Sequence, residues 1–100
     1  MQILKLNKRY LLGREGFSHA LVFTMHNDKY LKKKAVVEKL LHDMYGQGAF
    51  YYKPGHAYYD RHERPKWAKY TQTRNTAGVM QWFIGLKEES MLSVILLMVD

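Results

Sequence analysis

The 100-residue sequence contains no cysteine, only two prolines and no long run of apolar residues. The absence of cysteine excludes a disulfide scaffold, a thiolate metal site and a cysteine nucleophile, and it is compatible with a reducing compartment. No apolar run reaches the roughly 18 residues that a membrane span requires. Lysines interrupt the N-terminal segment, which therefore lacks the apolar core of a signal peptide. We expect a cytoplasmic protein with a single domain over residues 1–100.

Acidic residues are scarce: the chain has 9 Asp and Glu against 16 Lys and Arg, a net charge of +7 and a pI near 9.7. The charge is also uneven. It is +3 over residues 1–27, +2 over 28–45, +4 over 46–77 and −2 over 78–100. A small basic domain with this asymmetry is typical of proteins that bind a polyanion. The leading expectation is therefore nucleic acid, or a protein complex that handles it.

The signatures of cofactor-dependent enzymes are missing as well. The sequence has no P-loop, no dinucleotide-binding glycine motif, no nucleophile elbow and no zinc-protease motif. The RNA-recognition ribonucleoprotein motif and a helix-turn-helix pair are also absent. We expect no cofactor, and we expect binding rather than catalysis.

The first half of the chain predicts a hairpin followed by a helix. Residues 2–12 alternate between apolar and polar, residues 13–16 read as a turn, and residues 17–25 have a β-rich composition. Residues 28–45 have one apolar side, with Asn27 or Asp28 able to begin a helix and Gly46 able to end it. The predicted apolar side of this helix contains Tyr30, Val36, Val37, Leu40, Leu41 and Met44.

The second half predicts more strands. The segment "YYKPGHAYY" fits a hairpin with its turn at Pro54 and Gly55. Residues 79–86 and 91–99 predict a closing hairpin, and the nearly continuous apolar run 91–99 predicts a central strand covered on both faces. A helix over 91–99 is the alternative, disfavoured by the β-branched residues in that run. The fold class is α+β: an antiparallel sheet of four to six strands with one amphipathic helix packed on one face, in the order ββα, aromatic insert, ββ.

Residues 49–74 combine seven of the fourteen aromatic residues with six Lys and Arg. Cations neutralise phosphates, and exposed rings stack on unpaired bases with ~1–3 kcal/mol each. The cationic candidates are Arg61, Arg64, Lys66, Lys69 and Arg74, and the stacking candidates are Tyr58, Tyr59, Trp67 and Tyr70. The alternative is that these rings cover the second face of the sheet, which would move Tyr58, Tyr59 and Trp67 to the core.

A second basic cluster consists of Lys29, Lys32, Lys33 and Lys34, in the first two turns of the predicted helix. Positive charges at a helix N-terminus are mildly unfavourable because the helix dipole is positive there. A bound phosphate would relieve this, so we expect these lysines to contact an anionic partner. The alternative is that they are helix-forming residues on a solvated face.

A third group contains His56, Asp60, His62 and Glu63. If the segment is extended, His56, Asp60 and His62 share one face and could hold a metal ion, although the spacing matches no known closed site. A metal-independent ribonuclease would instead use His56 or His62 as general base, with Arg61 and Lys66 stabilising the transition state.

Three functions follow, in order of expectation. The first is a non-catalytic module that binds nucleic acid or a nucleic-acid-handling complex. The second is a phage or mobile-element protein that inhibits a host nucleic-acid-processing machine by stoichiometric binding. The third is the ribonuclease. We also expect Leu40 and Leu96 to be core residues, and a two-fold homodimer if the aromatic segment does not cover the sheet.

Overall fold

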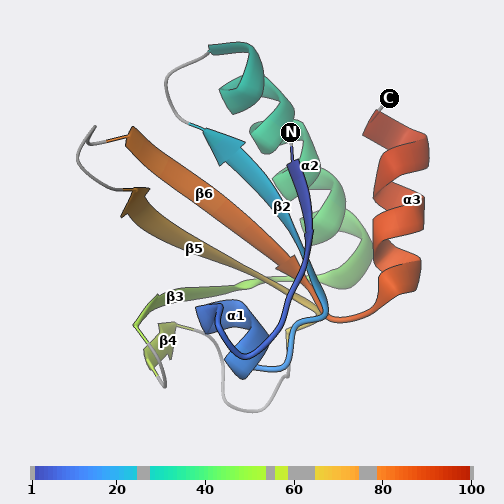
Figure 1. Ribbon diagram of the computed structural model, residues 1–100. Coiled ribbons are helices and arrows are strands. Elements are labelled where there is room, and N and C mark those ends of the chain that lie inside the picture. Colours follow the sequence, from blue (N-terminus) through green and yellow to red (C-terminus); the bar gives the residue numbers. More distant parts are fainter. Residues whose placement is uncertain (1, 25–27, 54–55, 59–64, 75–78, 100) are drawn as a thin grey trace.

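The protein folds as a curved six-stranded sheet with helices on both faces (Figure 1). This computed structural model describes residues 2–24, 28–53, 56–58, 65–74 and 79–99. The strands are β1 (Gln2–Lys5), β2 (His19–Thr24), β3 (Ala49–Lys53), β4 (His56–Tyr58), β5 (Trp67–Arg74) and β6 (Val79–Leu86). The helices are α1 (Leu11–Arg14), α2 (Asp28–Tyr45) and α3 (Glu89–Val99). The predicted α+β class is therefore confirmed.

The strand order is β1-β2-β6-β5-β3-β4. Pairs β1/β2, β2/β6, β6/β5 and β3/β4 are antiparallel, so the hairpin at "YYKPGHAYY" is confirmed. The first two strands pair as expected, but residues 6–18 connect them in place of the predicted turn at residues 13–16. Strands β3 and β5 are parallel, with Phe50 opposite Lys69. The sheet is thus mixed and not fully antiparallel, because the chain after β4 returns to run in the same direction as β3.

Two predictions of secondary structure are wrong. Residues 91–99 are not a strand: they belong to α3, so the closing hairpin is replaced by a strand followed by a helix. The continuous apolar run has no period that separates the two structures, and packing against the rest of the molecule selects the helix. The first strand also ends at Lys5 rather than at residue 12. A turn in which the Tyr10 N–H donates to the Asn7 carbonyl leads into α1, which buries Leu11 and Leu12.

Helix α2 spans the predicted residues 28–45, and Gly46 follows it with φ +84°, a left-handed conformation that ends helices well. The buried side of α2 is rotated about the helix axis relative to the apolar side that the sequence predicted. Val37 and Leu41 are fully buried and Leu40 is half-buried, whereas Val36 and Met44 are exposed. This rotation brings Lys34 and Glu38 of α2 to the border of the sheet.

Each face of the sheet has its own core. On one face, α2 and α3 cover Leu21 and Phe23 of β2 and Ile84 of β6, together with the buried Ile95 of α3. On the other face, α1 and residues of β3, β5 and β6 form a second core. Its members are Leu11, Leu12, Phe17, Ala20, Val22, Ala49, Tyr51, Ala68 and Phe83, with Leu4, Leu6 and Tyr70 packed against them. The strand residues alternate between the two cores, as the pleat of a sheet requires.

Candidate nucleic-acid interface

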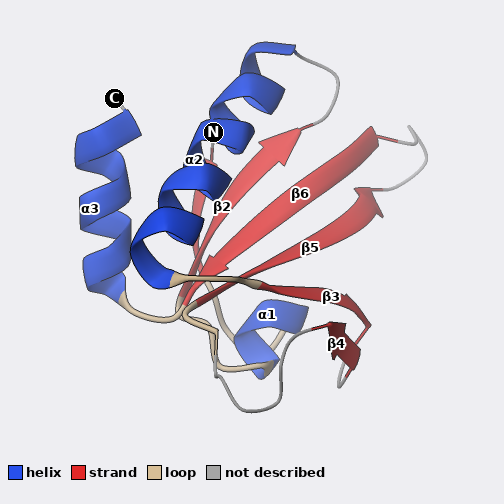
Figure 2. Ribbon diagram, turned by 180° about the vertical axis from the view of Figure 1, so that it is seen from behind, coloured by secondary structure: helices blue, strands red, loops and turns tan. Residues whose placement is uncertain are grey.

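The face of the sheet that carries α2 and α3 is covered only in part. Figure 2 shows the two helices side by side, with β6, β5 and β3 extending out beyond α2. Because neighbouring residues of a strand alternate between faces, the residues that share this face with the buried Trp67 and Ile84 can be read from the register. We call the part beyond α2 the open strip, and its residues are Phe50, Lys69, Thr71, Met80 and Trp82. All five retain solvent exposure.

Trp82 lies at the centre of the open strip and has two lysines near its ring. The Lys34 ammonium from α2 is 4.1 Å from the ring centroid, and the Lys69 ammonium from β5 is 5.7 Å away. The ring of Phe50, on β3, lies 6.5 Å from the Trp82 ring at an interplanar angle of 47°. The strip therefore combines two aromatic rings with two cations, supplied by three strands and one helix.

Glu38 links the two cations. Its Oε2 accepts a hydrogen bond from Lys34 Nζ at 3.2 Å, and its Oε1 lies 3.5 Å from Lys69 Nζ. The side chains of Lys34, Glu38 and Lys69 are 13%, 21% and 37% exposed, respectively. Lys34 and Glu38 are one helical turn apart, a spacing at which opposite charges meet on a helix surface. The long stem of Lys34 lies buried, while its ammonium group reaches the ring and the carboxylate.

Within the part of the chain that the structure describes, two buried polar atoms of this cluster have no hydrogen-bond partner: Glu38 Oε1 and Trp82 Nε1. The charge on Glu38 Oε1 is compensated by the Lys69 ammonium at 3.5 Å, an ion pair without a hydrogen bond. A buried donor without an acceptor, such as Trp82 Nε1, costs about 1–3 kcal/mol, and such atoms are rare. Both atoms lie at the junction of α2 with the open strip.

The structure brings together two clusters that are separate in the sequence. Lys34 comes from the helix lysines and Lys69 from the aromatic and basic segment, and both reach the same ring. Lys32 is exposed on α2, and Lys33 is half-buried there. The backbone of Lys29 lies in the first turn of α2.

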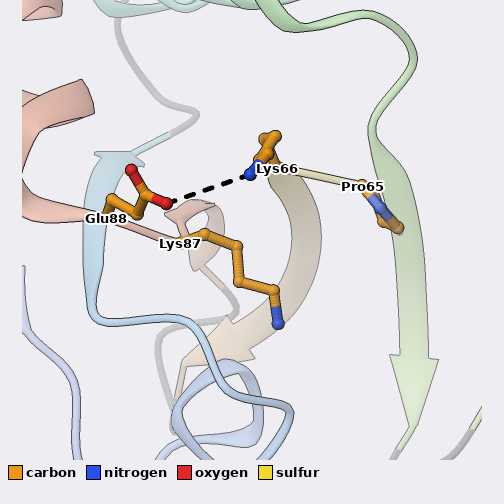
Figure 3. A pocket seen from close by; sticks show the side chains of 4 residues that line it. All are labelled: Pro65, Lys66, Lys87 and Glu88. Carbon is orange, nitrogen blue, oxygen red and sulfur yellow. Dashed lines mark ion pairs between the residues drawn. The ribbon is translucent and has the colours of Figure 1, made fainter. Parts of the chain in front are cut away.

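Lys66 lies elsewhere, at the other end of β5. With Pro65, Lys87 and Glu88 it lines an open pocket of about 290 Å³ (Figure 3). The Lys66 ammonium is 3.9 Å from Glu88 Oε1, and Lys87 lies over the ring of Phe17 at 4.6 Å. Each cation of this pocket thus already has a partner within the protein.

Two predicted stacking residues do not present a free ring. Trp67 is 5% exposed, and its Nε1 donates a 2.8 Å hydrogen bond to the Gly46 carbonyl. This is a correction: Trp67 belongs to the core between the sheet and the helices. Tyr70 is half-buried on the opposite face, where its ring packs 6.1 Å from that of Phe83. Trp67 is a core residue, but it lies on the face that carries α2 and α3 and does not cover the second face of the sheet, as the alternative had it.

Several predicted residues lie outside what the structure describes. Tyr59, Arg61 and Arg64 are not among the described residues, and Tyr58 and Arg74 are described only by their backbone in β4 and β5. Of the histidine and carboxylate group, only the backbone of His56 is described. Among the described side chains, no three His, Asp or Glu residues lie close enough to hold a metal ion. In the same part of the chain, no helix is long and apolar enough to cross a membrane.

The sequence analysis missed five residues of the candidate interface: Glu38, Phe50, Thr71, Met80 and Trp82. Trp82 lies in a strand that was predicted correctly, but its partners are set by the position of α2. The one available signal was the period of two in a strand, which places Trp82 and Met80 on the same face. No family model, curated protein or solved structure shows significant similarity to the chain.

Proposed function

We propose that the chain is a small non-catalytic module that binds single-stranded nucleic acid on the open strip. The observation that carries this proposal is the convergence of Lys34 and Lys69 on the ring of Trp82, with Phe50 beside it. Cations beside partly exposed rings are the combination that single-strand binding requires, because phosphates pair with the ammonium groups while bases stack on the rings. The strip lies flat on a sheet, where successive nucleotides can be laid across neighbouring strands.

The net charge of the protein supports the same partner. The chain carries +7 overall, and the residues before position 78 hold all of the excess positive charge. The open strip is built from β3, β5 and β6 and is bordered by α2, and of these four elements all but β6 come from this basic part. Long-range attraction would increase the rate at which a polyanion meets the strip.

The test is the binding of fluorescent single-stranded oligonucleotides of mixed sequence at several salt concentrations. Exchanging Lys34 and Lys69 for Gln should weaken binding and lower the slope of log K against log salt by about 1.4, because each phosphate contact on a single strand contributes about 0.7. Lys8→Gln with Lys39→Gln is the matched control, since both lysines are exposed and lie outside the strip and outside the predicted basic clusters. Equal losses in the two double variants would contradict an interface at the open strip.

A protein contact is the second candidate, and the outer surface of α3 favours it. Leu97 is 85% exposed, and Met98 of α3 and Val36 of α2 are exposed as well. No charged residue lies between Met91 and Val99, and residues 78–100 carry −2 while the rest of the chain is basic. Two copies of this basic protein would therefore repel each other least at α3, so we propose a two-fold contact there.

We expect the affinity of this contact to be low, because each copy supplies three exposed apolar side chains and a standard interface uses more. Light scattering should show a mass that rises above 11.9 kDa with protein concentration, and Leu97→Glu should return it to that of one chain. Lys39→Gln, an exposed change on α2 that lowers the net charge by one as Leu97→Glu does, is the control. A single-chain mass at millimolar concentration would overturn the two-fold contact.

A further inference from the structure

We propose that the carboxylate of Glu38 occupies the position of a ligand phosphate, and that a phosphate of the bound strand displaces it. This inference rests on the proposed function, because it concerns the same open strip. It assigns the space between Lys34 and Lys69 as a phosphate subsite. It also assigns Glu38 the role of an internal competitor that sets how tightly phosphates are held.

The geometry of the cluster carries the argument. Each oxygen of one carboxylate faces a different ammonium group, at 3.2 Å for Lys34 and 3.5 Å for Lys69. The two lysines come from different elements, α2 and β5, so the carboxylate bridges the helix and the sheet. A phosphodiester, like a carboxylate, carries one negative charge shared by two equivalent oxygens, and lysine binds either group as a point charge. A phosphate at this place would meet both ammonium groups in the same way.

The carboxylate is held less closely by Lys69 than by Lys34. Its buried Oε1 pairs with Lys69 at 3.5 Å without making a hydrogen bond, whereas its Oε2 accepts a hydrogen bond from Lys34 at 3.2 Å. The Lys34 ammonium keeps a second interaction that does not depend on Glu38, because it lies 4.1 Å from the centroid of the Trp82 ring. Movement of the Glu38 side chain would therefore leave Lys34 in place and open the space between the two ammonium groups.

This arrangement has a consequence for specificity. Every phosphate must displace Glu38, whatever molecule carries it, so the competitor lowers affinity for all of them. A nucleic-acid strand adds stacking on Trp82 and Phe50 and recovers the loss, whereas inorganic polyphosphate has no rings to stack. Glu38 therefore lowers both affinities and leaves their ratio to the stacking, so that at a given concentration a ligand that supplies charge alone stays unbound while one that adds bases still binds.

The test compares Glu38→Gln with Glu88→Gln. Both changes raise the net charge by one, and Glu88 is also paired with a lysine, but it lies in the pocket at the other end of β5. We expect Glu38→Gln to bind a single-stranded oligonucleotide about 3–10-fold more tightly, the range expected when two partly exposed ion pairs no longer compete. It should bind inorganic polyphosphate more tightly by at least the same factor, and Glu88→Gln should change either affinity less than 2-fold, as a distant single charge does at moderate salt.

A further variant tests whether the gain arises at the proposed place. Adding Lys34→Gln and Lys69→Gln to Glu38→Gln should remove the gain for both ligands. Glu38→Ser, which also removes the carboxylate, should reproduce the gain if Glu38→Gln does not fold, and circular dichroism reports folding in each case.

The outcomes separate the two proposals. If the wild-type protein binds the oligonucleotide and the affinity of Glu38→Gln rises no more than that of Glu88→Gln, the competitor role of Glu38 is overturned. The proposed function then stands. If no oligonucleotide binding occurs but Glu38→Gln gains affinity for polyphosphate that depends on both lysines, the phosphate subsite stands and the proposed function is overturned.

Discussion

The two tryptophans of this protein lie on the same face of neighbouring strands and have different surroundings. Trp67 is enclosed: its Nε1 donates to the Gly46 carbonyl, and its ring lies so near Gly48 that an added Cβ there would be 2.6 Å from it. Trp82 is half-buried, its Nε1 has no hydrogen-bond partner, and two lysines lie near its ring. The difference is set by α2, whose C-terminal end closes over one ring and whose flank only borders the other. The surroundings of Trp67 contribute to stability. Those of Trp82 leave its indole N–H without a hydrogen-bond acceptor among the described residues.

The largest effect expected from this comparison is on the free energy of unfolding after truncation to alanine. Trp67→Ala should cost about 3–5 kcal/mol, because it removes a fully packed ring and leaves a cavity between sheet and helices. Trp82→Ala should cost clearly less, since its ring is partly exposed and its buried N–H is unsatisfied. Urea unfolding followed by far-UV circular dichroism measures both. Equal costs would show that the two regions do not differ in packing.

A second comparison concerns adjacent leucines of α2. Leu41 is fully buried, whereas Leu40, which the sequence also predicted to be a core residue, is half-buried. Leu41→Ala should cost about 2–5 kcal/mol, and Leu40→Ala should fall below that range because water already reaches its side chain. Thermal melting of the two variants side by side checks the orientation of α2 over the sheet. A larger cost at Leu40 would mean that the helix is rotated toward the orientation predicted from sequence.

The same reasoning applies to Leu96 and Ile95 of α3. Leu96 is half-buried and Ile95 fully buried, so the predicted core position shifts by one residue once the segment is a helix. Ile95→Ala should therefore destabilise the protein more than Leu96→Ala, with Ile95 in the range of about 2–5 kcal/mol. The reverse order in urea unfolding would argue against the helical packing of α3.

The smallest and sharpest contrast uses phenylalanine in place of each tryptophan. Trp67→Phe should cost about 0.5–1.5 kcal/mol beyond the change in ring size, because it removes the hydrogen bond to Gly46. Trp82→Phe removes a buried donor that has no acceptor, so its effect on the free energy of unfolding should be close to neutral or stabilising.

In oligonucleotide binding, Trp82→Phe should retain most of the affinity and Trp82→Ala should lose about 10-fold or more, since stacking requires a ring. Loss of affinity in the phenylalanine variant would mean that the indole N–H, rather than the ring face, contacts the ligand.

The candidate interface was predicted only in part, and the reason is physical. Lys34 and Lys69 were found from the sequence because clustered cations are visible without a fold. Their meeting at Trp82 depends on how α2 is rotated about its axis relative to the sheet. The predicted apolar side of the helix gave the wrong rotation, because it included Val36 and Met44, which are exposed. Glu38 carried no sequence signal, since a glutamate four residues after a lysine on a helix is common on solvated faces.

The sequence by itself determined the α+β class, the helix over residues 28–45, the hairpin of β3 and β4 and the basic character of the chain. These follow from local periodicity, from residues that end helices and from charge, all of which act over a few residues. Only the tertiary structure decided that residues 91–99 form a helix, that β3 pairs with β5 in parallel, and that Trp67 is enclosed while Trp82 is not. An apolar run gives no period by which to choose between helix and strand. Which ring is covered depends on where α2 ends over the sheet, a relation between elements distant in the chain.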